Sequence, residues 1–295
     1  MDSEPRSLAA RTRAEEALIR FAILAGSHST DFVVIGGLNP DFLASAAPHR
    51  HLGTTDVDLL FELGFVYDRD DLDFGWLDRS LAEGGFTPVE NSAGWKWVGR
   101  LGEALVRLDL LCDVYDHPGQ AIHLPGATEA AAKNLAGPAA ALHEPTEREL
   151  IVTDTVRADF PDAPDRVRLR FASLGGYVAA KSAAFLSREQ EKDAYDLAFV
   201  IMYSPGGPAA AAVAAASTQT PSHSEPVHAT IASAVSRLAD IQSPWVEAAI
   251  RQLHLAGDES EDDQLRADVT QSAAQFLRAF SAHRADASTV GREEG

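Results

Sequence analysis

Three aspartates have the residue type and spacing that could do phosphate chemistry. Asp56 and Asp58 alternate in the apolar run 56–63, so on a strand both carboxylates point to one face. Asp109 interrupts a second apolar run, where a carboxylate is costly unless it is paired or binds a cation. If the two runs lie side by side, three carboxylates converge, and carboxylate oxygens are ligands that Mg²⁺ prefers. Such a cluster can hold two divalent ions, the arrangement used for in-line attack on a phosphate.

A glycine pair precedes these aspartates. The apolar run 31–37 ends in Gly36 and Gly37 and predicts a buried strand, followed by a short helix over 39–47. Backbone N–H groups at a helix start can bind phosphate, and glycine lets the phosphate approach the backbone closely. Alone, a glycine pair after a strand usually makes only a turn, and alternating aspartates usually form a solvated face. Their combination, in this order and between apolar flanks, is more specific.

The elements that must position these residues form an α/β half followed by a helical half. Helices are predicted over 7–25 and 74–84, and strands over 31–37, 56–63, 86–90, 95–100, 104–114 and 167–173. Beyond them, 174–203 is helical with a break near Ser187, and further helices are predicted near 227–241, 243–256 and 262–282. We therefore predict an α+β fold with a mixed sheet and flanking helices over 1–173, a helical region over 174–283, and a disordered tail over 284–295.

Composition narrows the class of protein. With 295 residues, 45% of them hydrophobic, the chain is long and apolar enough to bury a core. The single cysteine, Cys112, excludes a disulfide framework. No apolar run approaches the roughly 20 residues of a membrane helix, and the charged N-terminus lacks a signal-peptide pattern, so we expect a cytoplasmic protein without membrane contact. The net charge of −19 argues against broad, nonspecific nucleic-acid binding but not against a local basic pocket.

At this level of detail the chain resembles a known family. The pattern VVIGGL…GTTDVDLLFEL…VRLDLL is similar to the nucleotidyltransferase fold of the polymerase-beta superfamily. Within it, the chain most resembles the AbiEii-type nucleotidyltransferases, toxins of type IV toxin–antitoxin and abortive-infection systems. The segment 181–197 (KSAAFLSREQEKDAYDL) resembles the family's helix lysine, following arginine and Lys/Arg-Asp-x-x-Asp element. The likeness covers roughly residues 30–200.

The resemblance implies a role for each matching residue. Gly36 and Gly37 would hold the triphosphate of an NTP, Asp56 and Asp58 would bind both magnesium ions, and Asp109 would hold the ion that activates the acceptor hydroxyl. The rest of the pocket would come from the helical segment: Lys181, which would neutralise the nucleotide phosphates, and Arg188, Lys192, Asp193 and Asp196.

Two segments depart from the family pattern. The loop 38–55 places 18 residues between Gly37 and Asp56, more than the family leads us to expect, and it could be a substrate loop or a lengthened turn. The long region 115–166, whose stretch 117–146 is rich in Gly, Pro and Ala, would be a family-specific addition.

Several of these residues also have a structural explanation. On a helix, Lys192 and Asp196 are i, i+4 neighbours, which favours a surface salt bridge when the upstream motifs are ignored. Lys181 could pair with a local acid rather than with a nucleotide. Trp95 and Trp97 alternate around Lys96 and could stack on a base, although core packing is favoured; Asp113 could be a spare ligand or a strand-end residue.

The leading functional prediction is a Mg²⁺-dependent enzyme that transfers an NMP from an NTP to an acceptor hydroxyl and releases pyrophosphate. The resemblance suggests a tRNA end or another RNA as acceptor, a toxin role and an antitoxin partner, whereas the acidic charge speaks against RNA. A small-molecule nucleotidyltransferase of the aminoglycoside-modifying type and a non-catalytic nucleotide- or partner-binding protein are the alternatives. The charge of the cleft beyond Asp109 discriminates between an anionic and a cationic acceptor.

Overall fold

The predicted α+β class is confirmed. The computed structural model describes residues 6–64, 69, 71–102, 104–218 and 224–293, and is 53% helical and 18% strand. The chain divides into two compact units, which we call the sheet unit (Met1–Leu38 and Gly53–Ala172) and the helical unit (Asn39–Leu52 and Ser173–Gly295).

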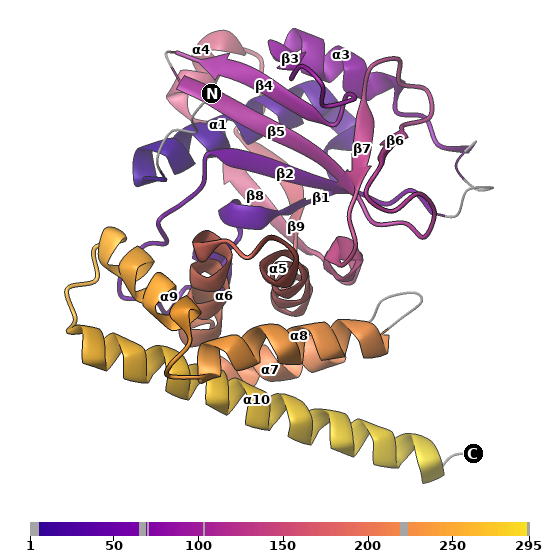
Figure 1. Ribbon diagram of the computed structural model, residues 1–295. Coiled ribbons are helices and arrows are strands. Elements are labelled where there is room, and N and C mark those ends of the chain that lie inside the picture. The colour runs from indigo at the N-terminus through magenta and orange to yellow at the C-terminus, as the bar shows by residue number, and fades with distance from the viewer. Residues whose placement is uncertain (1–5, 65–68, 70, 103, 219–223, 294–295) are drawn as a thin grey trace. The chain divides into compact units, whose positions relative to one another are not determined.

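The sheet unit is built on a mixed sheet (Figure 1). Its strands are β1 (Phe32–Ile35), β2 (Asp56–Phe61), β3 (Phe86–Pro88), β4 (Lys96–Leu101), β5 (Ala104–Cys112), β6 (Ala121–His123), β7 (Ala131–Asn134), β8 (Thr146–Ile151) and β9 (Arg166–Phe171). The strand order is β3-β4-β5-β2-β1-β9-β8, and β7 pairs with both β5 and β6. The pairs β2–β5, β1–β9 and β5–β7 are parallel, and the others are antiparallel.

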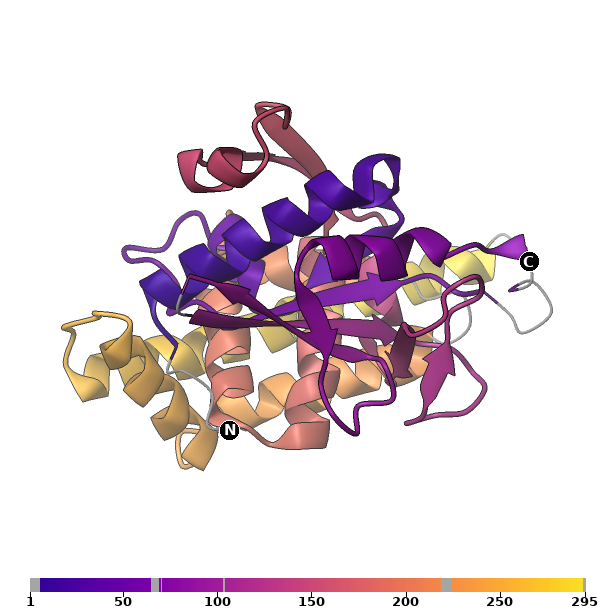
Figure 2. The same cartoon turned by 90° about the horizontal axis from the view of Figure 1, so that it is seen from above.

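One face of this sheet is covered by helices (Figure 2). The helices α1 (Leu8–Ala25) and α3 (Gly75–Glu83) pack together on it, while the short α4 (Asp154–Asp159) follows β8. Aromatic rings fill the space beneath: Phe32 lies 5.7 Å from Phe21 of α1 and 5.8 Å from Phe61 of β2, measured between ring centroids. This apolar layer determines which strand residues must point toward the helices.

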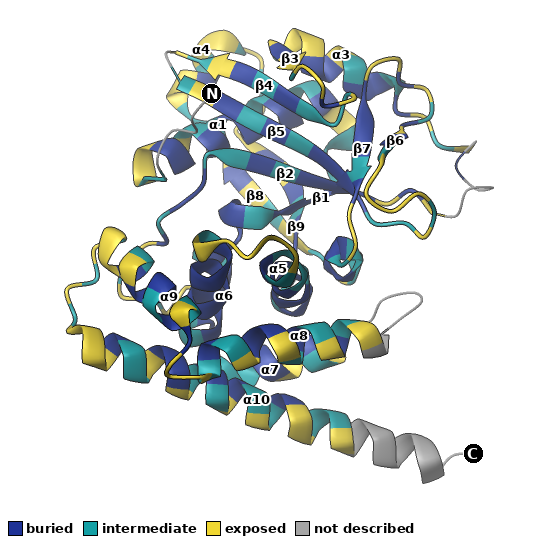
Figure 3. Cartoon of the chain, viewed as in Figure 1, coloured by how far each residue is buried: buried dark blue, intermediate teal, exposed yellow. Residues whose placement is uncertain are grey.

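Burial alternates along the two central strands (Figure 3). In β2, Val57 and Leu59 are fully buried, and in β5 so are Leu108 and Leu110. Because successive side chains point to opposite faces, the residues between them lie on the face away from α1 and α3. The alternating pattern read from the sequence therefore determines the side on which the aspartates lie.

The helical unit contains the short α2 (Pro40–Leu43) and six further helices among the described residues: α5 (Leu174–Arg188), α6 (Glu191–Tyr203), α7 (Gly207–Ser217), α8 (Ser224–Ala239), α9 (Pro244–Leu255) and α10 (Asp262–Glu293). The expected break near Ser187 falls at Glu189, which ends α5 in a left-handed conformation with φ 50°. Helix α7 is not among the helices expected from the sequence, because its segment starts at a Gly-Gly-Pro run, residues that usually interrupt a helix.

The last helix extends into the segment that the sequence analysis assigned to a tail. Helix α10 continues to Glu293, so it includes residues 284–293, while 294–295 lie outside the described residues. No proline follows Pro244 in the sequence, and Gly291 is the first glycine after Gly257, so nothing local ends the helix earlier.

The loop 38–55 departs from the predicted division at residue 173, because residues 39–52 belong to the helical unit. The His51 side chain is fully buried there; its ring stacks on Tyr195 at 4.8 Å, and its Nε2 lies 3.0 Å from an oxygen of Asp196. The backbone N–H of Leu52 donates to the Tyr195 hydroxyl, and His49 pairs with Asp258 at 3.1 Å. The segment is therefore a packed part of the helical unit and not a lengthened turn.

Within the described residues, no single helix is long and apolar enough to cross a membrane. Helices α6 and α7 pass such a test only when taken together, and they are bent by 110° relative to each other.

Candidate functional site

The register of β2 and β5 brings Asp58 and Asp109 together. The two strands pair in parallel with Asp58 directly opposite Asp109, and Asp56 is opposite Arg107. Asp56 lies two residues before Asp58 and shares its face, so all three carboxylates lie on the sheet face away from α1 and α3. The sequence predicted that the three carboxylates would converge if their two strands were neighbours, and β2 and β5 are neighbours in the sheet.

The surroundings of Asp109 strongly favour its neutral, protonated form. Its side chain is 15% exposed, and its Oδ2 lies 3.3 Å from Lys96 Nζ. Its Oδ1 is buried and has no hydrogen-bond partner within the described part of the chain. Burial, followed by the charge of Asp58, raises the pKa of Asp109 to about 7, against the opposing effect of Lys96. This carboxyl is therefore poised to gain or lose a proton near neutral pH.

Two basic residues beside the carboxylates were not identified from the sequence. Lys96, the first residue of β4, pairs in register with Asp109. Arg107 Nη1 lies 3.6 Å from Asp56 Oδ1. Arg107 could have been predicted beside the carboxylates, because it precedes Asp109 by two residues on one strand and must share its face. Lys96 could not, because its pairing with Asp109 depends on the register between two strands.

The glycine pair ends β1 against the carboxylates. Gly36 has φ +74°, and a Cβ placed on it would meet Asp58 Oδ2 at 1.9 Å. A Cβ on Gly37 would meet the side chain of Thr54 at 2.6 Å. The two glycines form the 3₁₀ turn η2 (Gly36–Leu38), and the helix α2 has only four residues. Strand β1 therefore does not lead into the N-terminus of a longer helix, and close approach to Asp58 is the geometric reason for Gly36.

The donor set fits a hard divalent cation, although one oxygen of Asp109 and one of Asp56 lie near protein cations here. Among the described residues, no group of three or more His, Cys, Asp or Glu side chains is arranged as a metal site. However, three carboxylates on one face, the buried Oδ1 of Asp109 without a partner, and a pKa raised by burial and by the charge of Asp58 are features that a divalent cation would relieve. Lys96 and Arg107 partly neutralise the group in its place.

The residues predicted from the helical segment form a cluster within the helical unit. Lys181 of α5 is buried, and its Nζ lies 2.8 Å from Asp196 Oδ2 and 3.2 Å from Asp193 Oδ1. Arg188 donates to the same Asp193 at 2.8 Å. Burial lowers the pKa of Lys181, but Asp196 and Asp193 raise it more, so the ammonium stays charged. These contacts are the ones expected if Lys181 pairs with acidic residues of its own unit and not with a nucleotide.

The i, i+4 surface pairs expected along α6 are replaced by contacts between helices. Asp193 and Asp196 pair with residues of α5, while Glu189 pairs with Arg237 and Glu191 with Arg251. Lys192 is half-buried. The charged residues of segment 181–197 therefore join α5 to α6. The buried contact between His51 and Asp196 also attaches residues 39–52 to α6.

The remaining candidates take structural positions. Trp97 is 3% exposed and donates through its indole N–H to the carbonyl of Gly94, in agreement with the core packing favoured for it. Asp113 accepts backbone N–H groups of Gly137 and Ala139 at 2.9 and 2.8 Å, just after the end of β5. Asp113 is thus a strand-end residue.

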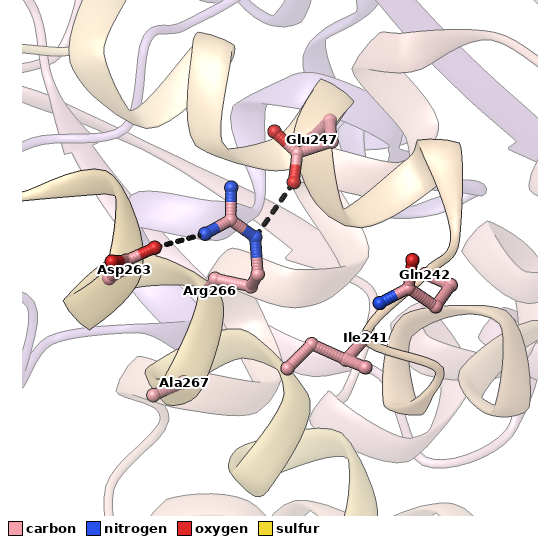
Figure 4. Close-up of a pocket in the computed structure, with 6 residues that line it drawn as sticks. All are labelled: Ile241, Gln242, Glu247, Asp263, Arg266 and Ala267. Carbon is pink, nitrogen blue, oxygen red and sulfur yellow. Dashed lines mark hydrogen bonds and ion pairs between the residues drawn. The ribbon is translucent and has the colours of Figure 1, made fainter.

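A surface hollow in the helical unit involves none of the candidate residues (Figure 4). It is lined by Ile241, Gln242, Glu247, Asp263, Arg266 and Ala267. The Arg266 guanidinium spans it, with hydrogen bonds to Glu247 at 2.9 Å and to Asp263 at 2.5 Å. Because the Arg266 guanidinium is already paired with two carboxylates, it is not free to bind an anionic ligand in this hollow.

Comparison with models of known protein families and with curated proteins finds no match to this chain. The likeness to AbiEii-type nucleotidyltransferases therefore depends on the motif residues alone.

Proposed function

We propose that this protein is a Mg²⁺-dependent nucleotidyltransferase that moves a nucleoside monophosphate from an NTP to an acceptor hydroxyl. The observation that carries the proposal is the register of β2 and β5, which puts Asp58 opposite Asp109 and keeps Asp56 on the same face. A sheet face with three carboxylates, one of them with a pKa raised to about 7, is an unfavourable arrangement for stability alone.

In this reaction the acceptor oxygen bonds to the α-phosphorus, the bond from that phosphorus to the oxygen bridging to the β-phosphate breaks, and pyrophosphate leaves with the electron pair. Asp109, which is opposite Asp58 on the same face, would hold the ion that activates the acceptor hydroxyl. Asp56 and Asp58 would hold Mg²⁺, which when bound supplies charge neutralisation for the phosphates. Gly36 lets the Asp58 carboxylate lie where a side chain at position 36 would clash with it.

One observation favours a second function, nucleotide binding without turnover. Lys96 and Arg107 already compensate Asp109 and Asp56, so the carboxylates have protein counter-ions in the absence of metal. A protein that only binds a nucleotide needs no divalent cation for chemistry. In such a protein Lys96 and Arg107 would remain the counter-ions of Asp109 and Asp56 when the nucleotide is bound.

The two functions are separated by a transfer assay. Each of the four NTPs, labelled at the α-phosphate, is incubated with the protein, Mg²⁺ and total cellular RNA, with and without small-molecule cell extract. We expect label to move to an acceptor with wild type and not with Asp58→Asn, whereas Glu147→Gln, a 62% exposed carboxylate on β8, keeps full activity. Equal transfer by Asp58→Asn contradicts the carboxylate site. Binding of a nonhydrolysable NTP in calorimetry without transfer to any acceptor supports the second function.

A further inference from the structure

One tryptophan lies where the neighbour of β5 changes from β4 to β7. Lys96, the first residue of β4, is opposite Asp109, and Lys133 of β7 is opposite Leu111. Between them, the backbone N–H of Leu110 donates to the carbonyl of Trp95 at 2.8 Å. Trp95 is half-buried, so part of its indole remains accessible at this junction.

Two lysines flank the Trp95 ring. Lys96 Nζ lies 4.6 Å from the ring centroid and 3.3 Å from Asp109 Oδ2, so it connects the indole to the carboxylate face. Lys133 Nζ lies 5.9 Å from the same centroid and also donates to the carbonyl of Gly119. Because Lys133 is in register with Leu111, two residues after Asp109, it shares the carboxylate face.

This local positive charge stands out against the composition of the chain. The sequence contains only four lysines, at 96, 133, 181 and 192, and has a net charge of −19. Two of the four meet over one indole ring. General surface composition does not account for such a pairing, since nearly all other basic residues of the chain are arginines.

The loop that carries Trp95 is rigidly held. The carbonyl of Gly94 accepts hydrogen bonds from the backbone N–H of Ala131 at 3.1 Å and from the Trp97 indole at 2.8 Å. Gly94 has φ +82°, and a Cβ there would meet the carbonyl oxygen of Glu129 at 2.1 Å. The backbone next to Trp95 is therefore held in place, which reduces the entropy lost when a ligand binds.

We propose that Trp95, Lys96 and Lys133 form a subsite that binds one nucleotide of a single-stranded nucleic acid, with the base on the indole and a phosphate on the lysines, beside Asp109. The inference rests on the proposed function, for which it identifies the acceptor side. An aromatic ring with adjacent ammonium groups is the combination that binds single strands. The same two ammonium groups would repel a cationic acceptor of the aminoglycoside type.

The test measures binding without catalysis. Fluorescein-labelled 12-mers of RNA and of DNA, with the same sequence, are titrated in EDTA at 50 and 200 mM NaCl and followed by anisotropy. The variants are Trp95→Ala, Trp95→Phe and Lys133→Ala, and Arg168→Ala, a 61% exposed cation on β9, is the control for loss of one charge. Melting temperatures are recorded for all variants, so that a folding defect in Trp95→Ala is recognised.

We expect Trp95→Ala to weaken binding about tenfold or more, with Trp95→Phe retaining most of the affinity. Lys133→Ala should weaken binding and lower the slope of log K against log salt by roughly one ion, while Arg168→Ala has little effect. A difference between the RNA and DNA arms identifies the sugar. Unchanged binding in both Trp95→Ala and Lys133→Ala, no binding by wild type, or equal affinity for free UMP would overturn the proposal.

This outcome is distinguishable from failure of the proposed function. If Asp58→Asn loses transfer but Lys133→Ala binds the oligonucleotide unchanged, the nucleotidyltransferase activity is supported and the subsite is rejected. If Lys133→Ala and Trp95→Ala weaken binding but the wild-type protein transfers no nucleotide, the subsite is supported and the nucleotidyltransferase activity is rejected.

Discussion

Replacing Asp109 by asparagine should stabilise the metal-free protein, and the gain should depend on pH. The pKa of Asp109 is raised to about 7 from the ordinary 3.8, first by burial and then by Asp58. At 1.36 kcal/mol for each pKa unit, its charged form costs the folded state roughly 4 kcal/mol. Asparagine has nearly the same shape and carries no charge, so this cost disappears.

The sign of the pH dependence follows from proton binding. Between 3.8 and about 7 the folded state binds more protons at Asp109 than the unfolded state does, so stability falls as pH rises through this window and levels off above it. At pH 5 the folded protein is mostly protonated at this site, and the remaining cost is only about 1–2 kcal/mol. We therefore expect the advantage of Asp109→Asn to be roughly 2–3 kcal/mol larger at pH 8 than at pH 5. Constant effects of the new amide cancel in this difference.

The assay is urea unfolding in EDTA at pH 5, 6, 7 and 8, followed by tryptophan fluorescence, to which the sheet unit contributes three of the four tryptophans. The exposed Glu147→Gln variant controls for loss of one negative charge. An equal advantage at pH 5 and pH 8, or a loss of stability at pH 8, would refute the reasoning, because it would mean that Lys96 fully compensates the carboxylate. Adding Mg²⁺ should stabilise wild type more than Asp109→Asn by linkage, and equal stabilisation of both would argue against a cation at this carboxylate.

Three further predictions concern stability. Gly36→Ala should cost at least about 1 kcal/mol more in urea unfolding than Gly85→Ala, because both have left-handed φ (+74° and +71°) but only at Gly36 would the new methyl clash with a side chain; equal costs would remove the packing argument. Lys181→Met should lose about 3–5 kcal/mol by leaving buried carboxylates underpaired, while Lys192→Met stays near wild type; unchanged stability with weaker NTP binding in calorimetry would favour the phosphate role instead. Asp78→Asn should destabilise at pH 7, because burial raises the pKa of Asp78 but hydrogen bonds from three backbone N–H groups lower it more; that stability is present above pH 3.8 and is lost as pH falls further, so wild type and variant must converge in acid.

Much of the sheet unit could be predicted from short-range patterns. The runs that contain Asp56 and Asp109 alternate with period two, and both became central strands with their aspartates on one face. The strands β6, β7 and β8 were not predicted, because β6 and β7 are short and rich in alanine, which has little preference for strands. A strong alternation of apolar residues was sufficient to predict the long strands β2 and β5. The strands β6, β7 and β8 lack such an alternation.

The inserted segment 39–52 shows the opposite case. Nothing in its composition indicates that it belongs with helices encoded more than 120 residues later, because the contacts of His51 with Tyr195 and Asp196 are long-range in sequence. The same reason explains why Lys181, Asp193 and Asp196 could be interpreted either as a nucleotide site or as a structural cluster.

Local patterns were enough to predict the α+β class, the strands that carry Asp56, Asp58 and Asp109, and the common face of Asp56 and Asp58, because alternation is a property of a single strand. The pairing of Asp58 with Asp109, and of Lys96 with Asp109 from the other side of β5, depends on how the strands come together in the sheet. Strand register depends on the packing of the whole apolar face, and a shift by one residue would have reversed every side chain. The pKa of Asp109 depends on that register, since burial and the neighbouring charge act only once the strands have paired.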